Sequence, residues 1–189
     1  MPHATPPETS RLSPDEGRKL VALAHAAVAA AVRDEMPPPI PADSFFHDRR
    51  GVFVTVHVHG QLRGCIGYPL PIKPLAEAII DLAASAALRD QRFEPVAPEE
   101  LADLDVEVSA LTVPHAIAGV SEIEVGRHGL IVGRGHSRGL LLPQVATEYG
   151  WEVETFLEHT CMKAGLPRDA WKQPGTDIQA FEAQVFGDR

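Results

Sequence analysis

The sequence has few cysteines, fewer basic than acidic residues and no long apolar run, and each shortage argues against a class of protein. Its 189 residues include only two cysteines, too few for a secreted scaffold held by several disulfides. The 17 basic residues against 26 acidic ones give a net charge of −9, which argues against a protein that coats nucleic acid. No apolar run approaches the roughly 20 residues of a membrane span, and residues 1–13 carry no apolar signal core. We therefore expect a cytoplasmic protein with reduced cysteines.

The composition is that of a folded globular chain. Hydrophobic residues make up 44% and charged residues 23% of the sequence. A chain of this length buries roughly 70% of its unfolded surface, enough for one substantial core or for two lobes. Residues 1–13 are rich in proline and lack periodicity, so we expect a mobile arm there. No linker is evident after it, and residues 14–189 are predicted to form a single domain with two lobes.

Apolar spacing predicts alternating helices and strands. Ser13, Pro14 and Glu16 form a capping box with proline at the first helical position, so a helix is expected over residues 14–35. Further helices are expected from residue 74, over 143–148 and over 152–164. Strands are expected at 52–58, 62–67, 103–112, 129–132, 139–142 and 178–186. This order indicates an α/β or α+β fold, with a mixed or largely antiparallel sheet flanked by helices.

Residues 61–67 hold the strongest candidate site. Cys65 lies between Gly64 and Gly67, and Arg63 precedes it by two residues. A cationic neighbour favours a thiolate, and flanking glycines let a substrate approach and could aim N–H groups at an oxyanion. The alternative is that Cys65 is a small buried side chain in a tight hairpin, with Arg63 in a structural salt bridge.

A second candidate lies in the glycine-rich stretch of residues 126–139. Arg127 and Arg134 lie there with His128, and arginine forks with turn N–H groups could cradle a phosphate or carboxylate. The glycine spacing differs from the dinucleotide fingerprint, so no Rossmann site is predicted. The alternative is a hairpin tip whose charges are merely solvated.

Other motifs give weaker indications. His57 and His59 would project from one strand face as a metal pair does, but no third ligand is evident, so no metal site is predicted. Neither a Gly-x-Ser-x-Gly elbow nor a Walker loop occurs, so serine-based catalysis has no support, and the cofactor is left open. Cys161 falls near the end of an amphipathic helix and is expected to be structural.

Six segments carry a family resemblance. They are LRGCIG at 62–67, DQRF at 90–93, LDVEVS at 104–109, GRHGLI at 126–131, GLLLPQVA at 139–146 and CMKAGL at 161–166. Together they resemble the AMMECR domain family, whose prokaryotic members are called AmmeMemoRadiSam system protein A. The resemblance covers about residues 14 to 186. Gln91 stands where the family usually has proline, which loosens the turn before Phe93.

The resemblance implies a two-lobed α/β fold in which a smaller lobe is inserted into a larger one, with a cleft near Cys65. It also implies an association with a Memo-like protein and a radical S-adenosylmethionine enzyme. It supplies no established reaction.

Our first hypothesis is a thiol-dependent enzyme, or the catalytic partner of one. Cys65 would be the nucleophile or redox thiol, and Arg63 would favour its thiolate. His128 or another histidine would act as acid and base, and Gly64 and Gly67 would shape the pocket.

The alternative hypothesis is a non-catalytic binding or scaffold protein. It would dock with the Memo-like or radical enzyme and hold a small anionic ligand or nucleotide through Arg63, Arg127 and Arg134. A role on nucleic acid is the weakest hypothesis, because the chain lacks an extensive basic and aromatic face.

Overall fold

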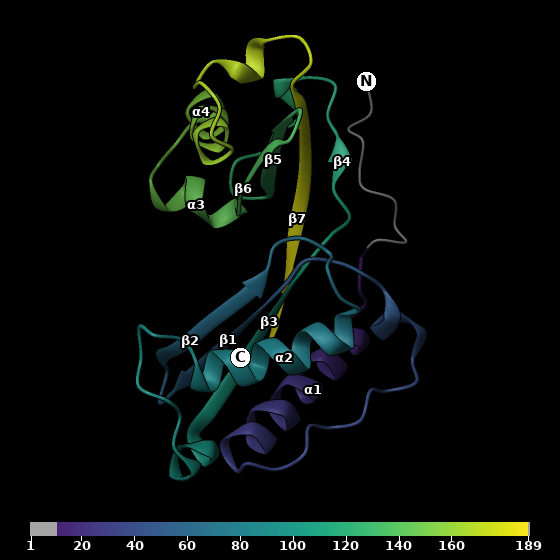
Figure 1. Ribbon diagram of the computed structural model, residues 1–189, viewed down its shortest axis with the longest axis vertical. Coiled ribbons are helices and arrows are strands. Elements are labelled where there is room, and N and C mark those ends of the chain that lie inside the picture. Colours follow the sequence, from purple (N-terminus) through teal and green to yellow (C-terminus); the bar gives the residue numbers. More distant parts are fainter. Residues whose placement is uncertain (1–10, 189) are drawn as a thin grey trace. The chain divides into compact units, whose positions relative to one another are not determined.

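The computed structural model describes residues 11–188, and the chain divides into two compact units (Figure 1). The larger unit comprises residues 11–111 and the C-terminal residues from 184 onward. The smaller unit comprises Thr112–Ala183 and is therefore inserted into the chain of the larger one, as the resemblance implied.

The mobile arm expected over residues 1–13 lies mostly outside the described residues. Leu12 is buried, its N–H donates to Oε1 of Gln184 at 2.7 Å, and its carbonyl accepts from Nε2 of the same side chain at 3.0 Å. Leu12 is therefore part of the larger unit.

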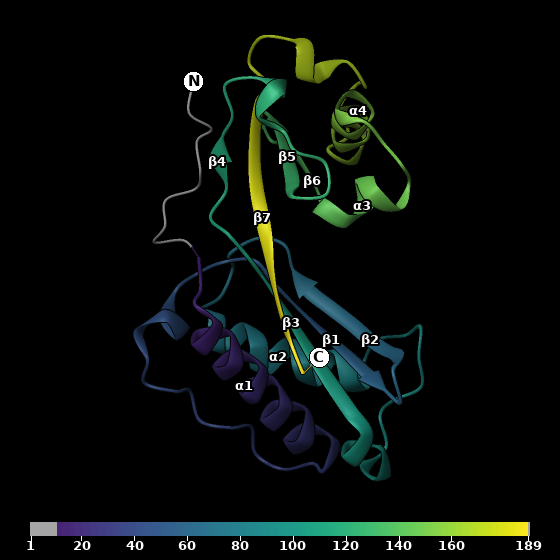
Figure 2. The same cartoon turned by 180° about the vertical axis from the view of Figure 1, so that it is seen from behind.

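The larger unit packs two helices on a sheet. Its main elements are α1 (Pro14–Val32), β1 (Val52–Val58), β2 (Gln61–Tyr68), α2 (Leu75–Leu88) and β3 (Leu104–Leu111), with 3-10 turns at Ser44–His47 and Pro98–Asp103. The two helices run side by side in both views (Figures 1 and 2). β1 lies between β2 and β3, and both pairings are antiparallel.

The start of α1 follows from its capping box. Oγ of Ser13 accepts the N–H of Glu16 at 3.3 Å, and Oε2 of Glu16 accepts the N–H of Ser13 at 2.7 Å. The capping box is as predicted, while the helix ends at Val32 rather than near residue 35.

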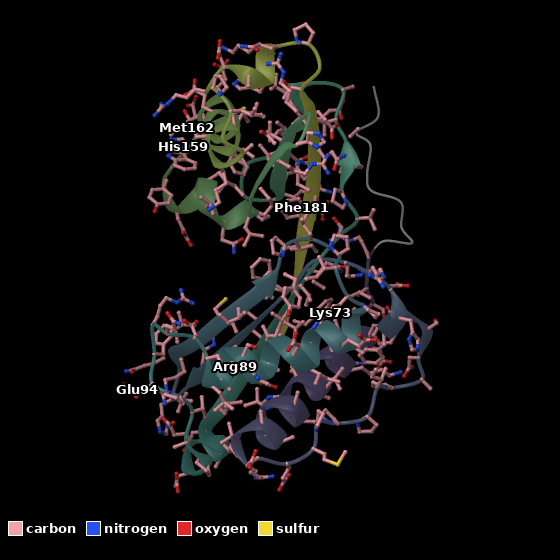
Figure 3. All side chains as sticks on the ribbon, in the orientation of Figure 1. Lys73, Arg89, Glu94, His159, Met162 and Phe181 are labelled. Carbon is pink, nitrogen blue, oxygen red and sulfur yellow. The ribbon has the colours of Figure 1, made fainter. Side chains whose placement is uncertain are left out.

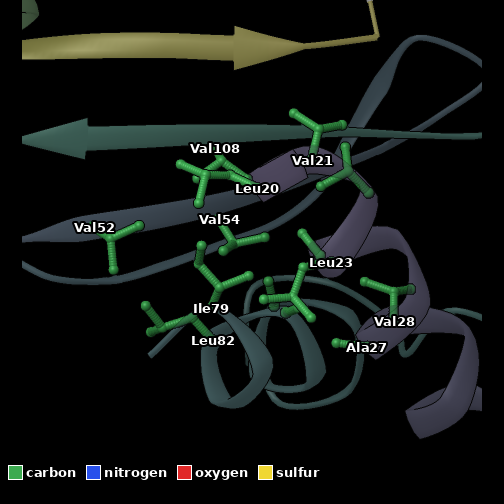
Figure 4. Packing of buried hydrophobic residues seen from close by; sticks show 14 of the residues in the cluster. Leu20, Val21, Leu23, Ala27, Val28, Val52, Val54, Ile79, Leu82 and Val108 are labelled. Carbon is green, nitrogen blue, oxygen red and sulfur yellow. The ribbon is translucent and has the colours of Figure 1, made fainter. Parts of the chain in front are cut away.

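The core of the larger unit lies between the helices and one face of the sheet. Every second residue of β1 is a buried valine, because alternate side chains of a strand point to opposite faces. Figure 4 shows Val52 and Val54 of β1 packed with side chains of both helices. The intervening residues of β1 therefore point to the opposite face.

The smaller unit has its own strands, helices and core. Its elements are β4 (His115–Ala116), β5 (His128–Arg134), β6 (Ser137–Leu141), α3 (Pro143–Glu148), α4 (Val153–Lys163) and β7 (Asp177–Gly187), with 3-10 turns at Val120–Glu122 and Ala170–Lys172. β7 pairs with β4 and β5, and β5 also pairs with β6, all antiparallel. Cys161 is buried in this core, as predicted, and burial raises the pKa of its thiol.

The antiparallel sheets and flanking helices confirm the predicted fold class. β7 begins in the smaller unit, and its last residues, from Gln184, belong to the larger one. None of the helices within residues 11–188 has the length and apolar character of a membrane span. The cytoplasmic location stays a prediction.

Candidate functional site

The glycines of the LRGCIG motif lie where β2 touches other parts of the larger unit. A Cβ on Gly64 would come within 1.9 Å of the carbonyl oxygen of Ala86 in α2, and one on Gly67 within 2.0 Å of the Phe53 ring. No side chain fits at either position without a shift. These contacts with the protein's own atoms explain both glycines without a ligand.

Cys65 lies on the face of the sheet that points away from α1 and α2. Its Cα partner on β1 is Thr55, and the partner of Thr55 on β3 is Glu107. The three side chains thus form one row across three strands, and each is half-buried. We call this side the polar face; it carries Thr55, His57, Cys65, Asp105 and Glu107.

The sulfur of Cys65 has a hydrogen-bond donor. Oγ1 of Thr55 donates to Sγ of Cys65 at 3.3 Å. A hydrogen bond that a sulfur accepts is stronger when the sulfur carries negative charge. The contact places a hydroxyl donor on the sulfur atom, which is the reacting atom in thiol chemistry.

An ion pair between the buried Asp90 and the exposed Arg92 holds the backbone of Cys65. Oδ2 of Asp90 accepts the N–H of Cys65 at 2.9 Å, and a guanidinium nitrogen of Arg92 donates to the Cys65 carbonyl at 3.1 Å. The same Arg92 nitrogen lies 2.6 Å from Oδ2 of Asp90, whose side chain is only 4% exposed. Hydrogen bonds from Arg92, with those from the N–H groups of Cys65 and Arg92, hold the pKa of the Asp90 carboxyl well below its usual range. The pair thus fixes a residue of β2, which is the end strand of the sheet within residues 11–188.

Arg63 is engaged by the loop that follows α2. Its guanidinium donates to Oε2 of Glu100 at 2.6 Å and to the carbonyl oxygens of Glu94 and Pro95 at 2.8 and 3.3 Å. Glu94 is labelled in this loop in Figure 3. The N–H of Ala97 and then Arg63 lower the pKa of Glu100. The cation that contacts Cys65 is accordingly Arg92 rather than Arg63, and Arg63 forms the structural salt bridge of the alternative interpretation.

His57 lies on the polar face, two residues along β1 from Thr55. Its Cα partner on β3 is Asp105. His57 and Asp105 also line a pocket of about 290 Å³ in the larger unit, together with Glu107 and Asp188. Sequence analysis considered His57 only as half of a metal pair. Its place on the same sheet face as Thr55 and Cys65 comes from the strand register.

The two arginines of the smaller unit that were predicted to bind an anion, Arg127 and Arg134, contact other side chains of that unit. Arg127 contacts Glu182 and Glu124, at 3.0 and 3.2 Å, and NH1 of Arg134 donates to Gln173 at 2.5 Å. These contacts do not bring Arg127 and Arg134 together around one point.

His128 is buried in the smaller unit. Its Nδ1 accepts the N–H of Glu124 at 3.1 Å, and its ring meets that of His115 edge-on, with centroids 6.3 Å apart. Burial, more than the nearby Arg127 charge, lowers the pKa of His128. The cysteine site contains His57, on the same sheet face, whereas His128 belongs to another unit.

No metal centre emerges from the described part of the chain. Within residues 11–188, no three His, Cys, Asp or Glu side chains are grouped as metal ligands would be. His59 lies in the β1–β2 turn with φ of 51° and is exposed, so it does not continue the strand face of His57.

Comparison with known proteins identifies the family of this chain. The AMMECR1 family model matches residues 21–186, which include the inserted unit, most of the larger unit and the whole LRGCIG motif. The chain belongs to the AMMECR1 family.

Relatives of this AMMECR1 chain match along nearly its whole length. A protein of Methanothermobacter thermautotrophicus is 54% identical over 183 residues, covering 93% of this chain and 95% of its own. A protein of Thermococcus kodakarensis is 47% identical over 188 residues, with 93% and 92% coverage. The crystal structure of uncharacterized protein PH0010 from Pyrococcus horikoshii is similar, with a TM-score of 0.75, 43% identity and 94% coverage of both chains. These matches establish the family and the fold and name no reaction.

Sequence analysis missed several residues around the cysteine. Asp90 and Arg92 belong to the DQRF segment, which carried the resemblance but no assigned role. Thr55 was predicted only as a strand residue. Their contacts with Cys65 join segments that are 10 to 27 residues apart in the sequence, so no local pattern reveals them.

Proposed function

We propose that this AMMECR1-family protein is a thiol-dependent enzyme in which Cys65 is the nucleophile. The observation that carries the proposal is the hydrogen bond from Oγ1 of Thr55 to Sγ of Cys65 on the polar face. A cysteine kept only for packing is expected among apolar side chains, as Cys161 is. Cys65 instead shares its row of the sheet with a hydroxyl and a carboxylate.

The surroundings of Cys65 suit a nucleophile in a second respect. A reacting atom must be held within a fraction of an ångström, by neighbours whose own positions are fixed. The Asp90–Arg92 pair binds both outward-facing backbone groups of Cys65. These two hydrogen bonds hold the backbone at Cys65 in place. Without them, the backbone of this edge strand would be more mobile.

The binding or scaffold hypothesis has less support. It requires arginines that are available to an anion, yet Arg63 pairs with Glu100, and Arg127 pairs with Glu124 and Glu182. A carboxylate already neutralises each of these two cations. The Memo-like and radical S-adenosylmethionine partners implied by the resemblance stay predictions.

Replacement of Thr55 tests the proposal. Thr55→Val keeps the shape of the side chain and removes the hydroxyl, whereas Thr55→Ser keeps the hydroxyl. We expect Thr55→Val to slow alkylation of Cys65 by iodoacetamide at pH 7 by about five- to tenfold, the equivalent of one hydrogen bond of about 1 kcal/mol. Thr55→Ser should react nearly as the parent does.

The rate is measured by peptide mass spectrometry, which separates Cys65 from Cys161. Circular dichroism checks that each variant is folded. Equal Cys65 rates in Thr55→Val, Thr55→Ser and the parent would show that the hydroxyl does not activate the sulfur, and the proposal would fail.

A further inference from the structure

We infer that His57 is the acid–base partner of Cys65, a role that sequence analysis gave to His128. The inference rests on the proposed function and goes beyond it, because it names the group that takes the thiol proton. It also locates the substrate in the pocket that His57 lines.

The strand register brings His57 and Cys65 onto one face. The pairing shifts between Val56 and His57, so that Thr55 is opposite Cys65 and His57 is opposite Leu62. Arg63 is the extra residue of this bulge. His57 is therefore a diagonal neighbour of Cys65, and such neighbours have Cβ atoms about 7–8 Å apart or less, within reach of long side chains.

Asp105 lies on the other side of His57 and can orient it. The two residues are directly opposite each other on β1 and β3. A base in nucleophilic catalysis is usually held in place by a third group, which also stabilises the imidazolium once it forms. Cys65, His57 and Asp105 lie on three successive strands in the order that this arrangement needs.

The pocket beside His57 gives room for a reacting group. It measures about 290 Å³ and is lined by His57, Asp105 and Glu107 together with residues at the end of β7, Asp188 among them. The charged groups around His57 are thus the carboxylates of Asp105, Glu107 and Asp188. Asp188 in turn lies 2.6 Å from Nε2 of His25. Carboxylates stabilise an imidazolium that forms during a proton transfer.

The other histidines near this sheet are less suited. His59 lies in the exposed turn, and its Nε2 is 3.8 Å from Asp103. His25 belongs to α1 and is engaged by Asp188. Among these three, only His57 lies opposite Asp105 and in the row next to that of Cys65.

The proposed step conserves atoms and charge. The proton of the Cys65 thiol passes to a ring nitrogen of His57, which leaves a thiolate beside an imidazolium. With iodoacetamide as the probe, the sulfur then attacks the CH₂ carbon, the carbon–sulfur bond forms, and iodide leaves with the electron pair of the carbon–iodine bond. The imidazolium afterwards gives its proton to water.

The experiment follows the alkylation rate of Cys65 between pH 5 and 8, where an imidazole changes its charge. We expect His57→Gln to lower the rate at pH 7 by at least about tenfold and to remove a step that the parent profile shows in this range. His59→Asn is the matched control, because it removes a histidine two residues away, at a position with positive φ that asparagine tolerates. Its profile should follow that of the parent.

A second variant separates chemistry from structure. His57→Ala enlarges the pocket that His57 lines. Added imidazole should therefore restore a part of the Cys65 rate, and it should not accelerate the parent or His59→Asn. A merely structural role of His57 gives no such rescue. Two results would overturn the inference: a His57→Gln profile that matches the parent, or the absence of rescue in a folded His57→Ala protein.

The failure of this inference can be told from the failure of the proposed function. If Cys65 of the parent depends on Thr55 but not on His57, only the inference is wrong. If Cys65 depends on neither, the proposed function is wrong as well.

Discussion

Burial restricts the ability of His128 to become charged. His128 is only 6% exposed, and its Nδ1 accepts a hydrogen bond from the N–H of Glu124. An accepting ring nitrogen carries no proton, so this bond requires the neutral imidazole. Arg127, Glu124, Glu182 and His115 surround the ring, and burial is the main cause of its lowered pKa.

The buried His128 predicts how the smaller unit responds to acid. Because its pKa is lower in the folded than in the unfolded chain, protons bind the unfolded chain more readily. Its contribution to stability is complete above about pH 6.5 and is lost as the pH falls toward the lowered pKa, by at most about 1.4 kcal/mol per pH unit. His128→Gln, which keeps a hydrogen-bond acceptor, should reduce this dependence.

Tryptophan fluorescence during urea unfolding measures the effect. The sequence has two tryptophans, Trp151 and Trp171, and both lie in the smaller unit. His136→Gln, in the exposed β5–β6 turn, is the control and should unfold as the parent does. The same loss of stability between pH 7 and 5 in the His128→Gln variant and the parent would refute the assignment.

At the scale of elements, the β1–β2 hairpin shows what the sequence could and could not predict. The alternation of valines correctly indicates β1 and its buried face. If the two strands paired regularly from the two-residue turn after Val58, Thr55 would be opposite Gly64. The bulge at Arg63 instead pairs Thr55 with Cys65. A bulge depends on tertiary packing, so the central contact of the site was not predictable.

Other elements follow directly from local signals. The capping box defines the start of α1, and glycine-rich residues correctly indicate the β5–β6 hairpin. The contacts of the Asp90–Arg92 pair with Cys65 differ, because the pair follows α2 in the sequence whereas Cys65 precedes it. Its residues were visible in the sequence, but their contacts were not.

The close packing of β2 on α2 predicts the effect of a methyl group at Gly64. The added Cβ of Gly64→Ala would meet the backbone oxygen of Ala86, which cannot move without shifting the helix. Overpacking of this kind costs about 1–3 kcal/mol, occasionally more. We expect a lower midpoint of thermal unfolding by circular dichroism.

Gly119→Ala is the matched control. A Cβ there has its nearest neighbour at an ordinary contact distance of 3.9 Å, so the midpoint should change little. If the two variants unfold at the same temperature, the packing of β2 on α2 is not as described.

At the scale of the whole molecule, the two units divide the candidate residues. The thiol, Thr55, His57 and the Asp90–Arg92 pair belong to the larger unit, whereas His128, Arg127 and Arg134 belong to the smaller. The family resemblance correctly predicted an inserted unit. Local sequence patterns gave no boundary, because no proline- or glycine-rich linker separates β3 from Thr112. The account therefore places thiol chemistry in the larger unit and makes it depend on the fold of that unit.

The most direct test compares the alkylation rate of Cys65 in the folded protein and in the same chain unfolded in urea, at pH 7. Ordinary cysteines react more slowly when the fold covers them, and Cys161, which is buried, provides that behaviour as an internal standard. We predict that Cys65 reacts faster in the folded protein than in the unfolded chain, while Cys161 reacts more slowly. A Cys65 that also reacts more slowly when folded would contradict the claim that the fold activates this thiol.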